Sequence, residues 1–287
     1  DVDLEDPEDL DMPFWVTAHE MGHQWWPHQV SGGNVQGSAF LSEGLSEYSA
    51  VSLLSKEKGE KQLRKFLKYE LDKYLMGRAM ESKHEPSIVQ TEGQQYIHYN
   101  KAGLIMYTLS DFIGRDRFNK ALGEFIDRFR YQSEPYANIG TFVETIKNNT
   151  PENLKYLVED TFEKITLYEN KAKEASAIKN QNGTYSVTFT VEAKKVYSDS
   201  LGIQTPAVLN DWLEVGILGD SEINGVEQEV PIYLKKVIIA DSISTYTFDV
   251  NQKPTKAGID PMNKFVDRDI DDNMIRVEIV SSVKEDK

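Results

Sequence analysis

The hydrophobic pattern of this chain changes period near residue 170, and this change constrains the fold more than any other feature. Apolar residues first recur at helical spacing, over residues 13–26, 41–59, 60–80, 116–130, 140–147 and 151–164. Beyond Tyr168, apolar and polar residues alternate in short runs separated by Gly, Asn, Asp and Pro, which is typical of half-buried strands. The runs lie at residues 185–193, 212–219, 230–239, 244–250 and 274–280. We therefore predict an α+β chain with a helical domain at residues 1–168 and a β-sandwich domain at residues 169–287.

The composition narrows the chemistry that such a chain can carry. Its 32 basic and 47 acidic side chains leave a formal charge of −15, which argues against nucleic acid and against an anionic membrane surface as partners. There is no cysteine, so a metal site must use His, Asp or Glu. Three of the five histidines, His19, His23 and His28, fall within ten residues. This clustering of histidines requires an explanation.

The segment His19-Glu20-Met21-Gly22-His23 carries the decisive motif. Residues four apart on an α-helix lie about one turn apart on the same face, so the imidazoles of His19 and His23 can share one ion. Two imidazoles and one carboxylate leave a fourth position open for water, an arrangement that suits Zn2+. Glu20 flanks that position and is placed to act as the general base.

The third ligand is expected from an acid on a neighbouring helix, and Glu43 in LSEGLSEY is the best candidate. Glu47 lies one turn further on the same face. There it could accept the spare N–H of a ligating histidine and fix its tautomer, as carboxylates near metal sites commonly do. An exposed helix charge is the alternative interpretation of Glu47.

HEMGHQWW followed by LSEGLSEY resembles the zinc aminopeptidases of the aminopeptidase N type, within the gluzincin clan. The gap between His23 and Glu43 is one residue longer than in the family pattern, and Ser42 replaces the family's Asn. The resemblance implies a helical, thermolysin-like catalytic subdomain, Zn2+ as cofactor and a peptide as substrate. It also implies that His19, His23 and Glu43 bind the metal.

A second match involves Tyr99-Asn100-Lys101-Ala102-Gly103, which resembles the family's Tyr-x-Lys-Gly-Ala segment with the last two residues exchanged. In the family, this tyrosine donates a hydrogen bond to the oxyanion of the tetrahedral intermediate, so the resemblance implies that role for Tyr99. Tyr96 and Tyr107 are alternatives. A buried structural tyrosine is a further interpretation of Tyr99.

The resemblance extends to a bacterial group in which a peptidase portion is fused to an ABC-transporter permease. It rests on the segments PFWVTAHEM, QVSGGNVQGS, YIHYNKAG, DTFEKITLYE and GIDPMNKFVDRDIDDN. It implies that the chain is a soluble fragment of a bacterial membrane protein, although no stretch of the chain is apolar enough to span a bilayer.

The family recognises the substrate's amino terminus through an upstream Gly-Ala-Met-Glu-Asn motif, which this sequence lacks. Three functions therefore stay open. The expected one is an aminopeptidase-type zinc hydrolase, and the alternatives are a zinc endopeptidase and a non-catalytic transporter module with a vestigial zinc site.

Two acidic segments are predicted to be solvated. DVDLEDPEDLD at the start of the chain is interpreted as a lead-in to the first helix. VDRDIDDN, at residues 266–273, resembles a calcium loop only superficially, because it lacks the glycine and terminal glutamate of the helix-loop-helix form. A solvated turn is the better interpretation.

Overall fold

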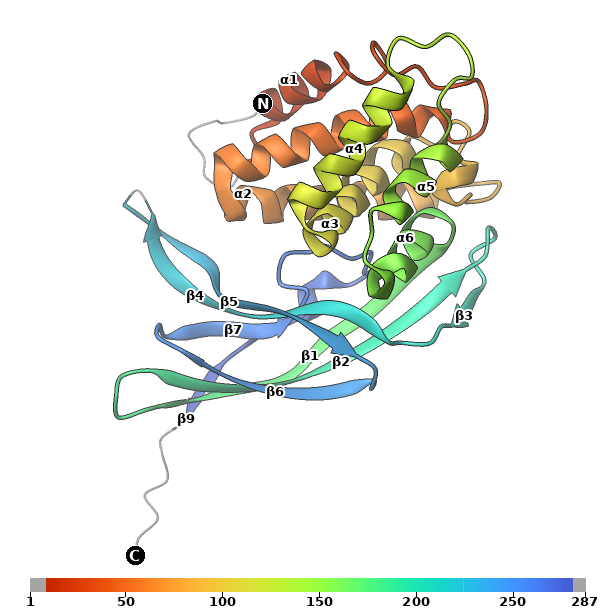
Figure 1. Cartoon of the computed structure of the whole chain (residues 1–287). Helices are drawn as coiled ribbons and strands as arrows, with labels where there is room; N and C mark the ends of the chain where they lie inside the picture. Colours follow the sequence, from red (N-terminus) through yellow and green to blue (C-terminus); the bar gives the residue numbers. More distant parts are fainter. Residues whose placement is uncertain (1–8, 224, 281–287) are drawn as a thin grey trace, which may run out of the picture. The chain divides into compact units, whose positions relative to one another are not determined.

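The computed structural model describes residues 9–223 and 225–280, which form two compact units. Unit 1 extends to Thr166 and includes Tyr197–Thr205, whereas unit 2 comprises Leu167–Val196 and the chain from Pro206 onward. Helices dominate unit 1 and strands dominate unit 2 (Figure 1). The predicted α+β class is confirmed.

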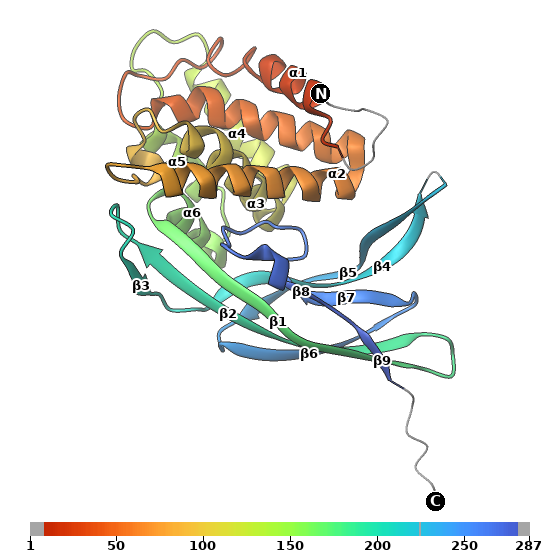
Figure 2. The same ribbon diagram turned by 180° about the vertical axis from the view of Figure 1, so that it is seen from behind.

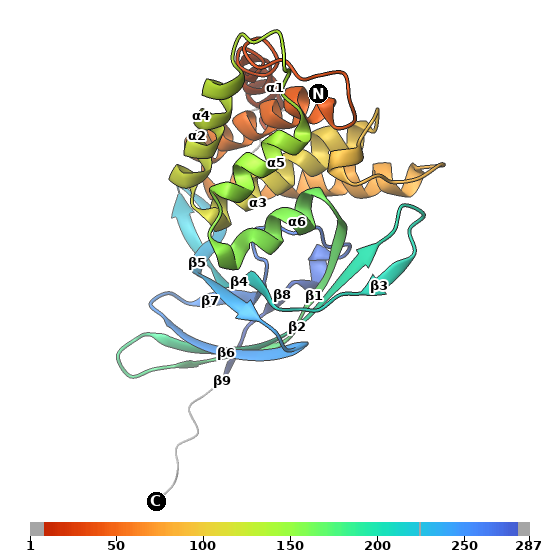
Figure 3. The same ribbon diagram turned by 45° about the vertical axis from the view of Figure 1, so that its right-hand side comes forward.

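The helices of unit 1 pack mainly on a long central helix and on one another. They are α1 (Met12–Gly22), α2 (Leu45–Met80), α3 (Ala102–Ile113), α4 (Arg115–Phe129), α5 (Ile139–Asn148) and α6 (Lys155–Phe162). Both α1 and α3 pack on α2 (Figure 2). Helix α5 lies between α4 and α6 (Figure 3). Within the described residues, no helix is long and apolar enough to cross a membrane.

Helix α1 is shorter than predicted, because it ends at Gly22 rather than near Trp26. After Gly22 the backbone tightens, with Trp25 N–H donating to the Gly22 carbonyl at 3.0 Å. The helix begins where the side chain of Asp11 accepts a hydrogen bond from Phe14 N–H at 3.1 Å. Asp11 is therefore a helix cap, and residues 1–8 of the acidic lead-in lie outside the described residues.

The predicted division into helices at 41–59 and 60–80 is confirmed, because α2 consists of two helices that meet at a kink at Gly59. Gly59 has φ 79°, a left-handed conformation that glycine adopts without strain. The first predicted turn is not α-helical, because Phe40–Gly44 forms a π-helical segment before α2 begins. A second π-helical segment, Tyr96–Lys101, leads into α3. The helix predicted at 151–164 also begins later, with a 3-10 turn at Glu152–Leu154 ahead of α6.

The strands form two sheets, and most of their residues belong to unit 2. The strands are β1 (Ile165–Lys179), β2 (Tyr185–Ser198), β3 (Gln204–Pro206), β4 (Asp211–Ile223), β5 (Val226–Ile239), β6 (Ile243–Val250), β7 (Pro254–Ile259), β8 (Met274–Arg276) and β9 (Glu278–Val280). One sheet has the order β3-β2-β1-β9, with β6 also paired to β2, and the other has the order β5-β4-β7-β8. Strand β9 runs parallel to β1, whereas β4 pairs antiparallel with both β5 and β7.

Polar and aromatic contacts join the two sheets. Tyr168 of β1 donates a hydrogen bond to Asp211 of β4 at 3.0 Å, and Lys195 of β2 donates to the same carboxylate at 3.2 Å. Tyr233 of β5 stacks on Phe248 of β6 with ring centroids 4.6 Å apart. The chain passes from one sheet to the other between β8 and β9, at Val277. The β half is therefore built from two sheets in contact, as in a sandwich.

The strand β1 was missed by the sequence analysis. Its sequence, ITLYENKAKEASAIK, is rich in Ala, Lys and Glu, which are depleted in strands generally. Pairing with its neighbours and burial of alternate residues override that preference, and Ala172, Ala175 and Ala177 all lie in the core.

Candidate metal centre

The two histidines of the motif sit at the carboxyl end of α1. His19 is buried within the helix, and His23 is its C-cap residue, with φ −62° and ψ −13°. Because these angles are still helical, His23 stays one turn beyond His19 even though the helix has ended. The two rings lie edge to face with centroids 4.8 Å apart.

Glu43 reaches the same point from the π-helical segment before α2. Its Oε1 accepts a hydrogen bond from Ser42 Oγ at 3.0 Å, which leaves Oε2 directed at the histidines. This segment approaches its neighbours closely at Gly44, where a Cβ atom would lie 2.8 Å from the Phe40 ring and 3.0 Å from Ala102. The π-helical turn is wider than an α-helical one, and position 44 has no side chain. Together these features let Glu43 lie beside α1.

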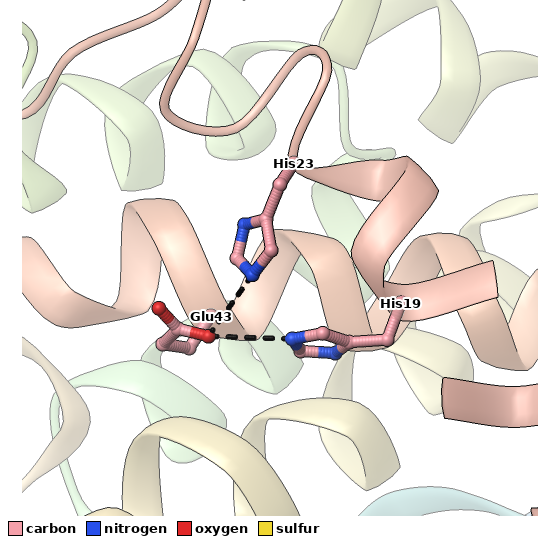
Figure 4. A group of neighbouring side chains, drawn as sticks. All are labelled: His19, His23 and Glu43. Carbon is pink, nitrogen blue, oxygen red and sulfur yellow. Dashed lines mark hydrogen bonds and ion pairs between the residues drawn. The ribbon is translucent and has the colours of Figure 1, made fainter. Parts of the chain in front are cut away.

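The three predicted ligand atoms converge on one another. Glu43 Oε2 lies 3.3 Å from His19 Nε2 and 3.4 Å from His23 Nε2, and all three atoms lie within 4.8 Å of each other (Figure 4). Ligands about 2.0–2.1 Å from a tetrahedral zinc ion are separated by roughly 3.3 Å. The donor set and its spacing therefore fit Zn2+.

The other ring nitrogens have partners that favour Nε2 as the metal-binding atom. His23 Nδ1 lies 2.5 Å from the Trp26 carbonyl, which can only accept, so Nδ1 carries the proton and Nε2 has a free lone pair. His19 Nδ1 lies 3.3 Å from Glu47 Oε1, an ion-pair contact rather than a well-aligned hydrogen bond. Glu47 is fully buried, so the structure brings it to the position predicted for it and it is not an exposed charge.

Sequence reasoning missed the residue that holds Glu47. Trp15, on α1, donates a hydrogen bond from its indole Nε1 to Glu47 Oε2 at 3.0 Å. The two oxygens of Glu47 thus face two residues of α1, Trp15 and His19. The periodic position of Trp15 on α1 indicated only a packing residue, and no motif reports a contact between residues 32 positions apart.

The carboxylates at the site favour a positive charge there. Burial alone would lower the pKa of His19, but its contacts with Glu43 and Glu47 raise it to about 9. Burial would raise the pKa of Glu43, but hydrogen bonds with His19, Tyr99 and Ser42 lower it to about 2. Two carboxylates therefore face the imidazole of His19. Their negative charge would also attract a metal cation.

Tyr99 lies beside the converging atoms, on the second π-helical segment. Its ring stacks on that of His19 with centroids 5.8 Å apart, and its hydroxyl shares a hydrogen bond with Glu43. Burial raises the pKa of Tyr99, and the hydrogen bond and nearby carboxylates raise it further, so the phenol keeps its proton. Of the two alternatives, Tyr96 donates instead to Glu81 at 3.4 Å, and Tyr107 is buried beside Arg115.

Glu20 stands outside the group of converging atoms. It follows His19 on the exposed side of α1, and its charge contributes to the raised pKa of Tyr99. A carboxylate that is exposed and close to the tyrosine is accessible to a substrate.

A second buried carboxylate, Glu70, lies behind Glu47 and was also missed by the sequence analysis. Burial raises its pKa well above the ordinary value, and the charge of Glu47 adds to this effect. Asn100 donates a hydrogen bond to Glu70 Oε2 at 2.9 Å. Because Asn100 follows Tyr99, this bond ties the segment that carries the tyrosine to α2.

Comparisons with known proteins agree with this geometry. A family model described as the peptidase family M1 domain matches residues 7–162. Human aminopeptidase N is 28% identical over 164 residues, which are 53% of this chain and 17% of that protein. Human endoplasmic reticulum aminopeptidase 2 is 25% identical over 129 residues, which are 42% of this chain and 13% of that protein.

Solved structures also resemble the chain. The crystal structure of Legionella pneumophila aminopeptidase A in complex with aspartic acid aligns with 94% of this chain and 27% of its own, at 16% identity and a TM-score of 0.45. The chain thus spans only a small part of the proteins that it matches. The family match contains the predicted site residues, which are His19, Glu20, His23, Glu43, Glu47 and Tyr99.

Proposed function

This chain belongs to peptidase family M1, and we propose that it carries the zinc centre of an aminopeptidase-type metallopeptidase. The observation that carries the proposal is the convergence of His19 Nε2 and His23 Nε2 on Glu43 Oε2, at 3.3 and 3.4 Å. These three side chains would hold the metal. The printed names of the two human relatives, both aminopeptidases, support the aminopeptidase type.

The residues around the ligands have distinct roles in the proposed hydrolysis. When bound, Zn2+ supplies a Lewis acid that polarises the scissile carbonyl and lowers the pKa of a coordinated water. Glu20 takes a proton from the attacking water and returns it to the leaving amine. Tyr99 donates a hydrogen bond to the oxyanion, for which its raised pKa keeps it protonated. Glu47 orients His19 and favours the Nδ1–H tautomer.

We further propose that the chain is part of a longer, membrane-embedded bacterial protein. Its segments, such as GIDPMNKFVDRDIDDN, resemble the peptidase portion of transporter fusions, and it spans 13–17% of the two human relatives. The parent reading frame tests this: it should encode apolar segments of about 20 residues, and their absence would contradict the proposal.

Two alternatives keep the zinc centre and change its use. These alternatives are a non-catalytic module of a transport system and a zinc endopeptidase. A peptide library read by mass spectrometry separates the three functions. Loss of single amino-terminal residues supports the aminopeptidase, internal cleavage supports the endopeptidase, and no cleavage by zinc-loaded protein supports the module.

Metal analysis of variants tests the centre itself. Glu43→Ala should lose zinc, because it removes the only acidic ligand, whereas Glu20→Gln should keep about one zinc per chain and lose about 10²–10⁴-fold in rate. Glu57→Gln, at an exposed position of α2, is the matched control and should match the unmodified chain in both measurements. Unchanged zinc content in Glu43→Ala would remove Glu43 from the ligand set.

A further inference from the structure

The segment 260–273 of unit 2 buries polar side chains that the sequence analysis expected to be solvated. Asp267 is 1% exposed and Asn273 is 1% exposed, whereas Asp269 and Asp271 of the same segment are exposed. The prediction of a solvated turn for residues 266–273 is therefore wrong at its two ends, whereas the residues between them are exposed or partly exposed. The physical reason is that Asp267 accepts hydrogen bonds from the backbone N–H groups of Asn170, at 2.8 Å, and Asp269, at 3.1 Å.

This segment lies along strand β1. The backbone N–H of Tyr168 donates to the Val266 carbonyl at 2.8 Å, and the Tyr168 ring meets that of Phe265 with centroids 4.9 Å apart. Asn170 is two residues further along β1, so its side chain is on the same face of the strand as Tyr168. That face is the one covered by the segment, and Asn170 is only 3% exposed.

Two buried amides at this place have atoms that lack hydrogen-bond partners. Neither Oδ1 nor Nδ2 of Asn170 has one, and Oδ1 of Asn273 has none either. The amide N–H2 of Asn273 instead lies close enough to the Asp267 carboxylate for a hydrogen bond that lowers the pKa of Asp267. Buried polar groups are nearly always satisfied, and each unmade bond costs about 1–3 kcal/mol. The unpartnered amide of Asn170 and the unpartnered amide oxygen of Asn273 therefore require an explanation.

The charges of the surrounding residues also favour a bound cation. Asp260, which is fully buried, accepts hydrogen bonds from the backbone N–H groups of Lys264 and Phe265, at 2.9 and 3.0 Å. The Lys264 ammonium lies 2.7 Å from Glu214. Burial raises the pKa of Asp267 to about 7, and the charge of Asp260 contributes. These three buried acids and one lysine carry a net negative charge when ionised.

We propose that Asn170, Asp267 and Asn273 form a site for a calcium ion in unit 2, separate from the zinc centre. The ion would be coordinated by the amide oxygens of both asparagines and by a carboxylate oxygen of Asp267. Asp272 is the fourth donor, because its buried Oδ1 lacks a hydrogen-bond partner while its Oδ2 pairs with Lys171 Nζ at 2.8 Å. Bound there, the ion fastens the segment 260–273 to β1.

The donor set selects calcium among common cations. Carboxylate and amide oxygens are hard ligands, and Ca2+ accepts six to eight of them in flexible geometry. Mg2+ demands a near-ideal octahedron and keeps several waters, which a buried set of protein amides does not offer. Zn2+ is well suited to imidazole nitrogen ligands, so the zinc centre and this site are chemically distinct.

The test uses the full chain loaded with zinc, so that the His and Glu ligands of the first site are occupied. After removal of calcium with a calcium-selective chelator, Ca2+ is titrated in a calorimeter and in a thermal melt. We expect one Ca2+ per chain, and a Tm at least about 5 °C higher at a hundredfold excess over Kd. Mg2+ at the same concentration should shift the Tm much less.

Two variants separate a metal site from a set of strained amides. Asn170→Leu, of similar size and without polar atoms, should abolish the calcium response while leaving the calcium-free chain as stable as before or more stable. Asp269→Asn, an exposed acid of the same segment, should keep the response. A chain without a calcium response, in which buried waters satisfy the amides, would overturn the proposal. An equal response in Asn170→Leu would also overturn it.

Discussion

The indole Nε1 of Trp15 donates a 3.0 Å hydrogen bond to Oε2 of Glu47, whose other oxygen lies 3.3 Å from Nδ1 of His19. One buried carboxylate thus links two residues of α1 that are four apart. The ring of Trp15 also packs on Phe66 of α2, with centroids 5.4 Å apart. The orientation of the His19 imidazole therefore depends on how α1 packs against α2.

Replacing Trp15 tests this dependence. Trp15→Phe keeps an aromatic ring against Phe66 and removes the N–H donor, so Glu47 loses one restraint and His19 is held less firmly. Zinc affinity, measured by competition with a chelator, should fall about 10–100-fold. Trp25→Phe is the control, because Trp25 is 44% exposed. Equal zinc affinity in the two variants would show that Trp15 only packs.

Zinc uptake should release a proton and strengthen with pH. The pKa of His19 in the metal-free chain is raised to about 9 from 6.5, so stabilisation from its protonated form is present below pH 6.5 and is lost as the pH rises through 9. Zinc needs the neutral imidazole and must displace this proton. The apparent zinc affinity should therefore rise by up to about tenfold per pH unit between 6.5 and 9.

Calorimetry in buffers of different ionisation enthalpy measures the proton release directly. At pH 7.5 about one proton should leave per zinc bound. Glu47→Gln removes one of the groups that raise the pKa of His19, so its proton release at this pH should be smaller. Zinc uptake without proton release in the unmodified chain would contradict the raised pKa.

Removing the Tyr99 hydroxyl should affect turnover and leave the metal in place. Tyr99→Phe keeps the ring that stacks on His19 and removes the proposed oxyanion donor, so kcat should fall about 10²–10³-fold with unchanged zinc content. KM should change much less, because the bond forms with the transition state. Tyr96→Phe, whose hydroxyl bonds Glu81 instead, should change kcat by only a few-fold. Equal losses in both variants would indicate a structural role for Tyr99.

The sequence predicted the parts of the site that depend on local spacing. His19 and His23 are four apart on one helix, and that geometry follows from the helical repeat alone. The π-helical segments could not be predicted, since the one that carries Glu43 depends on the contact of Gly44 with Ala102, a residue distant in the sequence. The support of Glu47 by Trp15 was missed for the same reason.

The β half illustrates a different limit. Its alternating strands were recognised, but β1 was not, because its Ala, Lys and Glu residues carry no strand preference and only pairing defines it. Asp267 and Asn273 were expected to be solvated, because their segment lacks the glycine and terminal glutamate of a helix-loop-helix calcium loop. Their burial depends on β1, which lies beside them. Because β1 was not predicted, this burial could not be predicted either.

Two helical glycines near the site should respond oppositely to alanine. A Cβ at Gly103 of α3 would lie 3.5 Å from the Glu47 side chain and 3.8 Å from Glu70, ordinary contact distances. Gly103→Ala should therefore raise the free energy of unfolding by about 0.5–1 kcal/mol, because alanine loses less entropy on entering a helix. A Cβ at Gly77 of α2 would lie 2.3 Å from Tyr96, so Gly77→Ala should lower it by about 1–3 kcal/mol. Urea unfolding of the zinc-loaded chain measures both, and a destabilised Gly103→Ala would mean that α3 packs against the buried carboxylates with no room for a methyl group.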